Sequence, residues 1–216
     1  MSIPEIFMNL LPGMGASIQI FLCTLVCSLP LGLLIAFGRM SKNRILQSIM
    51  KVYISIMRGT PLMLQLMVVY FGPYFLFGIR ITNAYRFYAV LIGFGLNYAA
   101  YFAEIYRGGI GSMDRGQYEA AQLLGYNKIQ TFFKIVMPQV IKRILPSVTN
   151  EVITLVKDTS LAFSIAYLEM FTMAKALASS QKSMMPFVAA AIFYYIFNLL
   201  VAFIMESIEK KLAYYR

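Results

Sequence analysis

Five long apolar stretches alternate with shorter polar and basic stretches along this chain. A helix needs roughly 20 residues to cross the hydrocarbon core of a bilayer, and each apolar stretch has about that length. The pattern therefore predicts five membrane-spanning helices, within residues 14–38, 52–79, 85–106, 144–167 and 185–208. The polar stretch at about residues 108–143 is too long for a turn, and we expect it to form a loop outside the membrane.

The composition supports an all-α integral membrane protein. Of its 216 residues, 60% are hydrophobic and only 13% are charged, whereas soluble domains carry about 25% charged residues. The length fits one domain, so we expect residues 1–216 to form a single transmembrane unit. Residues 1–13 contain no Lys or Arg, which favours a retained first span over a signal peptide.

The basic residues predict the orientation of the chain in the membrane. If the spans alternate, fourteen of the nineteen Lys and Arg residues fall on one side, within residues 39–58, 107–143 and 210–216. Cytoplasmic loops of membrane proteins carry an excess of Lys and Arg. We therefore expect the loop at 108–143 and the C-terminus to be cytoplasmic, and the N-terminus to lie outside.

Three acids lie inside predicted spans, where a charge is costly and is a functional candidate. Glu104 lies in the third span, and Glu151 and Asp158 lie in the fourth. Residues seven apart differ by about 20° around a helix, so Glu151 and Asp158 share a face, with Thr154 close to it. Asn97 shares a face with Glu104 in the same way. Two such polar faces predict a water-filled cavity that suits a cationic solute.

Structural alternatives exist for these polar residues. Glu104 can pair with Arg107, and Asp158 with Lys157, to hold the helices together. Glu151 has no basic neighbour at a spacing of three or four residues, which makes it the strongest candidate for solute binding. In the second span, Pro61, Gly72 and Pro73 either break the helix or only kink it, and an ordinary kink is the simpler expectation.

The loop contains EAAQLLGYNKIQTFFKIVMPQ from Glu119 to Gln139. This composition predicts two short helices joined at Gly125, with exposed apolar side chains. Such a knob suits docking into the groove of a partner, and an amphipathic hairpin lying on the membrane is the alternative.

The loop resembles the EAA coupling motif of ABC importer permeases, in which Glu119, Ala120, Ala121, Gly125, Ile135 and Pro138 match in register. Met137 stands where the motif usually has Leu, a change of similar volume. The stretches RGTPLMLQLMVVYFG, YFAEIYRGGI and LVKDTSLAF resemble the polar amino-acid branch of these permeases. The resemblance covers nearly the whole chain.

This resemblance implies the five-helix type I ABC importer permease fold in a bacterial plasma membrane. It implies a second permease subunit, identical or different, two cytoplasmic ATPase subunits that bind ATP and Mg²⁺, and an external amino-acid-binding protein. An acid at the position of Glu151, preceded by Asn150, resembles members that carry histidine, lysine or arginine. Glutamine and glutamate permeases of the same branch are the alternative.

Other classes of function fit the sequence less well. The chain has no histidine, which excludes the common zinc and haem sites, and it has no GxxxxGK[ST] phosphate loop. We therefore expect a transport subunit that is not itself an enzyme, without a cofactor or metal of its own. A channel or a secondary transporter that uses Asp158 or Glu104 as a proton site is the rival hypothesis.

Overall fold

The computed structural model describes residues 2–212, which contain helices and turns but no strand. Arg216, one of the basic residues that predict the orientation, lies outside the described residues. The helices are α1 (Ile3–Arg39), α2 (Arg44–Gly59), α3 (Leu62–Phe77), α4 (Asn83–Gly111), α5 (Arg115–Leu123), α6 (Lys128–Gln130), the π-helical turn η1 (Thr131–Val136), α7 (Met137–Asp158), the 3₁₀ segment η2 (Thr159–Ile165), α8 (Met170–Gln181) and α9 (Met185–Leu212).

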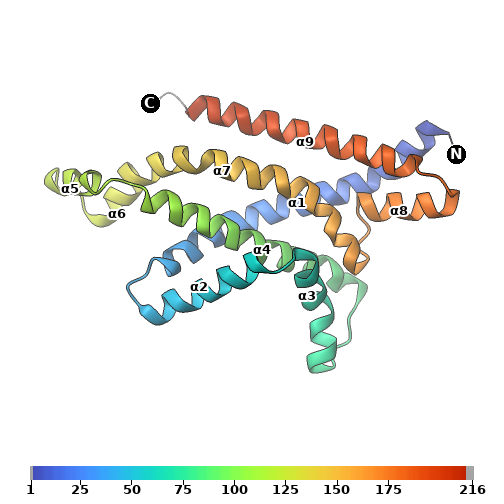
Figure 1. Cartoon of the computed structure of the whole chain (residues 1–216), viewed down its shortest axis with the longest axis horizontal. Coiled ribbons are helices and arrows are strands. Elements are labelled where there is room, and N and C mark those ends of the chain that lie inside the picture. Colours follow the sequence, from blue (N-terminus) through green and yellow to red (C-terminus); the bar gives the residue numbers. More distant parts are fainter. Residues whose placement is uncertain (1, 213–216) are drawn as a thin grey trace.

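Within residues 2–212, three helices, α1, α4 and α9, are long and apolar enough to cross a membrane in one piece. Two more spans are completed by bent pairs: α2 with α3, at 109°, and the Lys128–Ile165 segment with α8, at 58°. The number reaches the predicted five if each bent pair crosses once. Figure 1 shows the sharper bend, where α3 turns away from the direction of α2.

The prediction of an ordinary kink in the second span was wrong, because the helix breaks at Thr60 and Pro61. Thr60 is extended, with φ −121° and ψ 148°, and Pro61, the N-cap of α3, is also extended, with ψ 132°. Proline disfavours the helical region for the residue before it and lacks the N–H that would continue α2. The helix does not break at Gly72 and Pro73, since α3 runs through both residues to Phe77.

The fourth span also differs from its prediction as one helix within residues 144–167. It narrows into the 3₁₀ segment η2 after Asp158 and ends at Ala166, which has a φ of 54°. α8 then starts at Met170 with Glu169 as its N-cap, whose carboxylate accepts from the backbone N–H groups of Phe171 and Thr172. The Glu169 side chain therefore satisfies two of the N–H groups that the start of α8 leaves without intrahelical partners.

Helix α4 lies at the centre of the bundle and packs along α1. Gly32 of α1 allows this approach, because a Cβ there would lie only 2.8 Å from the Cβ of Phe102 and 3.0 Å from the carbonyl oxygen of Ala99. Small residues at helix contacts are common in membranes, where close packing replaces the hydrophobic effect as the driving force. The fully buried Phe94, Tyr98 and Phe102 continue this core along α4.

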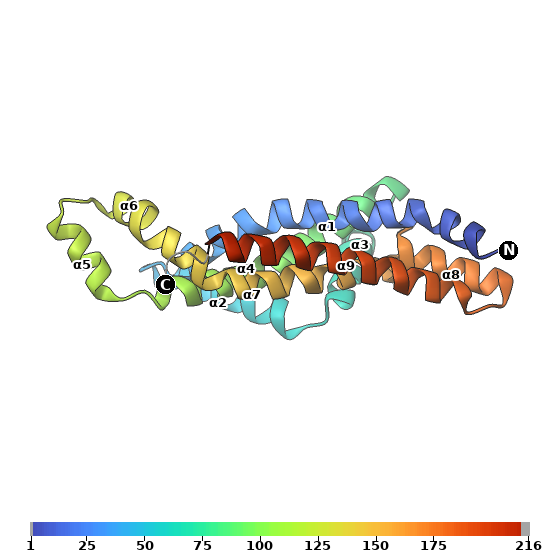
Figure 2. The ribbon, with the colours of Figure 1, turned by 90° about the horizontal axis from the view of Figure 1, so that it is seen from above.

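The α5–α6 hairpin extends from one end of the elongated molecule, while the N-terminus and α8 lie at the other end (Figure 2). Gly125 ends α5 with a φ of 78°. Its N–H donates to the carbonyl of Gln122, and the N–H of Tyr126 donates to that of Ala121, both at 3.0 Å. This Schellman pattern favours glycine at the left-handed position, and it confirms the predicted division of the loop at Gly125.

Candidate functional site

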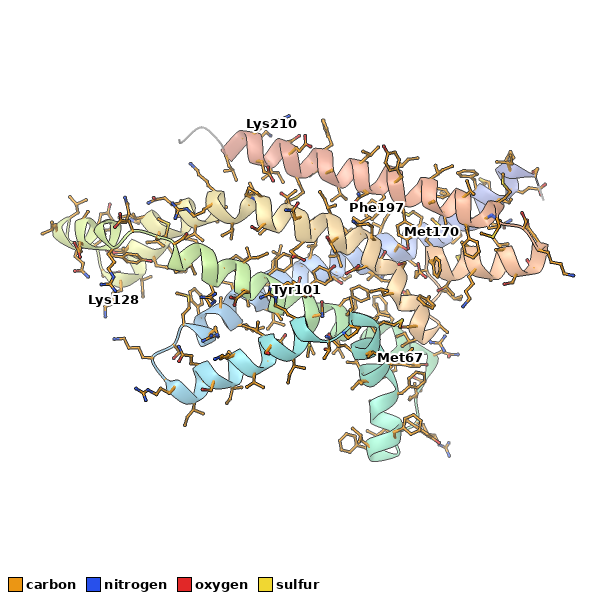
Figure 3. The ribbon with its side chains drawn as sticks, in the orientation of Figure 1. Met67, Tyr101, Lys128, Met170, Phe197 and Lys210 are labelled. Carbon is orange, nitrogen blue, oxygen red and sulfur yellow. The ribbon has the colours of Figure 1, made fainter. Side chains whose placement is uncertain are left out.

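A cavity of about 370 Å³ lies where the α2–α3 elbow meets α4 and α7. Its wall combines polar and apolar side chains from four elements: Thr60, Pro61, Leu62, Asn97, Tyr98, Tyr101, Glu151, Thr154, Asp158 and Leu161. Tyr101, labelled in Figure 3, lies near the middle of the molecule on α4. The broken second span is therefore part of this wall, through the three residues at its bend, Thr60, Pro61 and Leu62.

The acids of α7 lie together on the cavity wall, as their spacing of seven residues predicts. Glu151 and Asp158 both line it, and Thr154 lies between them. Asp158 accepts a hydrogen bond of 2.7 Å from the hydroxyl of Tyr98 on α4. It forms no ion pair with Lys157, whose side chain is exposed, within the described part of the chain. If Asp158 has a purely structural role, its partner is therefore Tyr98 and not Lys157.

Two of the predicted solute-binding residues lie away from the cavity wall. Glu104 forms an ion pair with Arg107, one turn further along α4, and accepts from the guanidinium Nε at 3.0 Å. Asn150 is exposed, and its backbone carbonyl accepts a 2.9 Å hydrogen bond from the Thr154 hydroxyl. Glu104 thus pairs with Arg107, the partner expected for a structural role in holding the helices together.

The elbow is held by two side-chain amides. Gln65 of α3 donates from Nε2 to the carbonyl oxygens of Met57 at 3.0 Å and Thr60 at 3.1 Å, and to the Thr60 hydroxyl at 2.8 Å. Asn97 of α4 donates from Nδ2 to Met57 O at 3.0 Å and to Gln65 Oε1 at 2.9 Å. Polar backbone groups freed by a helix break inside a membrane need such partners, so these amides stabilise the bend.

Most polar hydrogens on the cavity wall are committed to protein acceptors. Besides the Asn97 amide, the hydroxyls of three residues donate to neighbouring groups: Tyr98 to Asp158, Thr154 to Asn150 O, and Thr60 to Ile56 O at 2.8 Å. The hydroxyl of Tyr101 makes no hydrogen bond to any described residue. The side chains therefore offer the cavity mainly acceptors, and two of these acceptors are carboxylates.

Sequence reasoning missed several members of this site. Thr60 and Gln65 were not singled out, although both stand close to Pro61 in the sequence. A single polar residue within one helical turn after a break-forming proline is the signal that identifies Gln65. Tyr98 and Tyr101 were not singled out either, and both line the cavity wall. Arg58 lies 5.3 Å from the ring centre of Tyr101 and places a cation beside this ring.

The residues predicted to couple to an ATPase lie on and around the α5–α6 hairpin. Glu119 and Ala120 are exposed on α5, while Ala121 is buried, with 1% of its surface accessible. Ile135 lies in η1 and Pro138 begins α7. The apolar side chains around the turn are strongly exposed: Leu123, Leu124, Ile129 and Phe133. The hairpin thus presents an apolar tip, as the docking interpretation of the loop requires.

Comparison with known proteins adds a family and relatives. The family model described as binding-protein-dependent transport system inner membrane component matches residues 28–214. A putative glutamine transport system permease protein of Rickettsia bellii is 39% identical over 188 residues, which cover 87% of this chain and 85% of that protein. The arginine transport system permease protein of Bacillus subtilis is 35% identical, over 94% of this chain and 92% of that protein.

A solved structure is similar over nearly the whole fold. The crystal structure of an amino acid ABC transporter with histidines contains a chain with a TM-score of 0.84 and 29% identity, and the match covers 94% of each chain. The five-helix importer permease fold expected from the EAA-type loop is therefore confirmed. The names of these similar proteins refer to different amino acids, glutamine and arginine.

Proposed function

The chain belongs to the family of binding-protein-dependent transport system inner membrane components, and we propose that it is the permease subunit of an ATP-driven importer of basic amino acids. Arginine, lysine and histidine are the proposed cargo. The observation that carries this proposal is the cavity between the α2–α3 elbow, α4 and α7, whose side chains offer two carboxylates and mainly acceptors.

The charge of the cavity favours a cationic side chain. Glu151 and Asp158 line the same wall, and neither forms an ion pair with a described Lys or Arg residue. Arg58, which lies over the Tyr101 ring, forms no ion pair with either acid within the described part of the chain, and a carboxylate at membrane depth is costly unless a cation pairs with it. A guanidinium or ammonium group donates several hydrogen bonds and carries the opposite charge, so it matches both the charge and the acceptor pattern.

The elbow suits the other end of an amino acid. Helix α3 begins at Leu62, on the cavity wall, directly after Pro61. The first N–H groups of a helix and its positive dipole end attract anions, and broken helices in transporters use this end for carboxylates. The cavity therefore combines a place for an α-carboxylate at the elbow with acids for a cationic side chain along α7.

The proposed mechanism is alternating access with help from partners. The α5–α6 hairpin docks into an ATPase subunit, which binds ATP and Mg²⁺, and a second permease subunit completes the membrane part. Closure of the ATPase pair moves the hairpin and shifts the equilibrium between outward-open and inward-open cavities. An external binding protein delivers the amino acid. The basic hairpin and C-terminus lie in the cytoplasm, and the N-terminus lies outside.

The test is uptake by proteoliposomes that contain the permease, its ATPase and its binding protein. Labelled arginine uptake should require ATP inside, and unlabelled lysine or histidine should compete better than any neutral amino acid. Preferential competition by glutamine would overturn the basic cargo. Uptake without the ATPase would overturn the importer mechanism and favour an ion-coupled transporter.

Glutamine is the second candidate cargo. One observation favours it: a relative with 39% identity is named as a putative glutamine transport system permease protein. A glutamine side chain also donates hydrogen bonds, through its NH₂ group, but it needs a donor for its own carbonyl. The Asn97 and Tyr98 donors are committed within the protein, which leaves the Tyr101 hydroxyl as a side-chain donor on a wall that carries two carboxylates. The cavity therefore matches a guanidinium or ammonium group better.

A further inference from the structure

We propose that Gln65 is a positioning residue that sets which solutes the cavity prefers, by fixing the orientation of the Asn97 amide. This inference deepens the proposed function and rests on the same cavity. Gln65 is not one of the residues that line the cavity. It acts through Asn97, which is 96% buried and lies on the wall.

Backbone carbonyls determine the orientation of both amides. A carbonyl oxygen can only accept, so the Gln65 atom that contacts Met57 O and Thr60 O must be its nitrogen. The remaining Gln65 oxygen therefore faces Asn97 and accepts from it at 2.9 Å. Met57 O accepts from the same Asn97 nitrogen at 3.0 Å. Asn97 thus has one acceptor for each of its two amide hydrogens.

This arrangement leaves Asn97 with its oxygen for the cavity. Its NH₂ group is fully used by the elbow, and its carbonyl oxygen has no partner among the described residues. An amide oxygen is a good acceptor for an ammonium or guanidinium group and a poor neighbour for a carbonyl oxygen. Because the elbow uses the NH₂ group of Asn97, this amide can act toward the cavity only as an acceptor.

Loss of Gln65 would release this control. With Met57 O as its only remaining acceptor, the Asn97 amide could rotate and present an N–H to the cavity. A free N–H donor stabilises the side-chain carbonyl of glutamine, whereas it repels a cationic head group. We therefore expect Gln65 to influence discrimination between arginine and glutamine more than it influences the maximal rate of transport.

The experiment is a double-mutant cycle in the reconstituted transporter. Gln65→Met, which preserves length and apolar volume, should lower the ratio of arginine to glutamine transport efficiency about tenfold, the size of one hydrogen bond to a charged group. Asn97→Ala should lower this ratio similarly, and the double variant should lower it no further, because Gln65 acts through Asn97. Gln47→Met, on the other half of the broken span, is the matched control and should leave the ratio unchanged.

Two results would overturn the inference. One is an unchanged ratio in Gln65→Met, whether uptake of both solutes is kept or falls equally, and the other is additive effects in the double variant. Should Gln65→Met fail to assemble with the ATPase, Gln65→Asn provides the second test, since a shorter amide keeps the chemistry but cannot reach both partners. It should give the same direction of change. Each ratio is compared with that of the unmodified protein. The test of Gln65 is therefore separate from the question of which amino acid the unmodified protein prefers.

Discussion

The hydroxyl of Tyr98 donates a 2.7 Å hydrogen bond to Asp158 and thereby joins α4 to α7 across the cavity wall. Tyr98 is almost fully buried, with 2% of its surface exposed. Its ring packs at 6.2–6.4 Å from Phe94, Tyr101 and Phe102. The aromatic core of α4 thus holds the hydroxyl in place, and Asp158 has a partner even when the cavity contains no solute.

Tyr98→Phe should destabilise the bundle without changing its packing. The variant removes one hydrogen bond to a carboxylate, an effect of about 1.5–3 kcal/mol, and keeps the ring. The midpoint of thermal unfolding of the purified transporter in detergent should fall. Tyr195→Phe is the control, because Tyr195 is 65% exposed on α9, and it should not change the midpoint. Equal midpoints for both variants would contradict a structural role for this bond.

Glu151→Gln should weaken transport of basic amino acids strongly. The change keeps the shape of the side chain and removes the charge from the cavity wall. Loss of a hydrogen bond between charged groups corresponds to roughly a ten- to hundredfold lower transport efficiency for arginine. Glu206→Gln, an exposed acid near the end of α9, is the matched control. An unchanged arginine efficiency in Glu151→Gln would remove the main support for a cationic cargo.

Glu104→Gln should have a small effect on stability and none on solute preference. Glu104 lies outside the cavity wall and pairs with Arg107, and their side chains are 28% and 41% exposed. Exposed ion pairs contribute less than about 1 kcal/mol. Competition assays should therefore give the same order of amino acids as the unmodified protein. A selective loss of arginine competition would place Glu104 in the solute path after all.

The contrast between these acids marks what the sequence predicts and what it leaves open. The spacing of seven residues placed Glu151 and Asp158 on one face, because helix geometry alone decides it. The same rule placed Asn97 and Glu104 on one face, yet only Asn97 lines the cavity, because Arg107 is within reach of Glu104. An acid on the cavity-facing side of a helix can also pair with a basic residue nearby, and the spacing alone does not decide which of the two it does.

The broken span escaped prediction for a different reason. Mainly apolar stretches flank the break, at residues 52–57 and 62–71, and only the short run at residues 58–60 is polar, because a bend inside a membrane needs no long polar loop. The 109° turn instead depends on donors that satisfy the freed carbonyls of Met57 and Thr60. One of these donors, Asn97, comes from α4, more than thirty residues away in the sequence. Such a partner becomes visible only when both helices are in place.

Gly125→Ala should lower both solute-stimulated ATP hydrolysis and uptake. Gly125 adopts a φ of 78°, and a left-handed conformation costs a residue with a Cβ about 1–2 kcal/mol. Because no other atom lies within 4 Å of the added Cβ, the effect comes from the backbone alone. The α5–α6 turn should rearrange, and the hairpin should dock less well on the ATPase. Arginine-stimulated ATP hydrolysis and uptake should both fall.

The control for this hairpin variant is Gly111→Ala, at the end of α4, where an added Cβ also meets no atom within 4 Å and the glycine has no positive φ. Solute binding to Gly125→Ala, measured in detergent with labelled arginine, should match that of the unmodified protein, since the cavity contains no residue of the hairpin. Loss of binding together with uptake would mean that the hairpin shapes the cavity itself. Full uptake in Gly125→Ala would argue that the turn at Gly125 is not needed for docking.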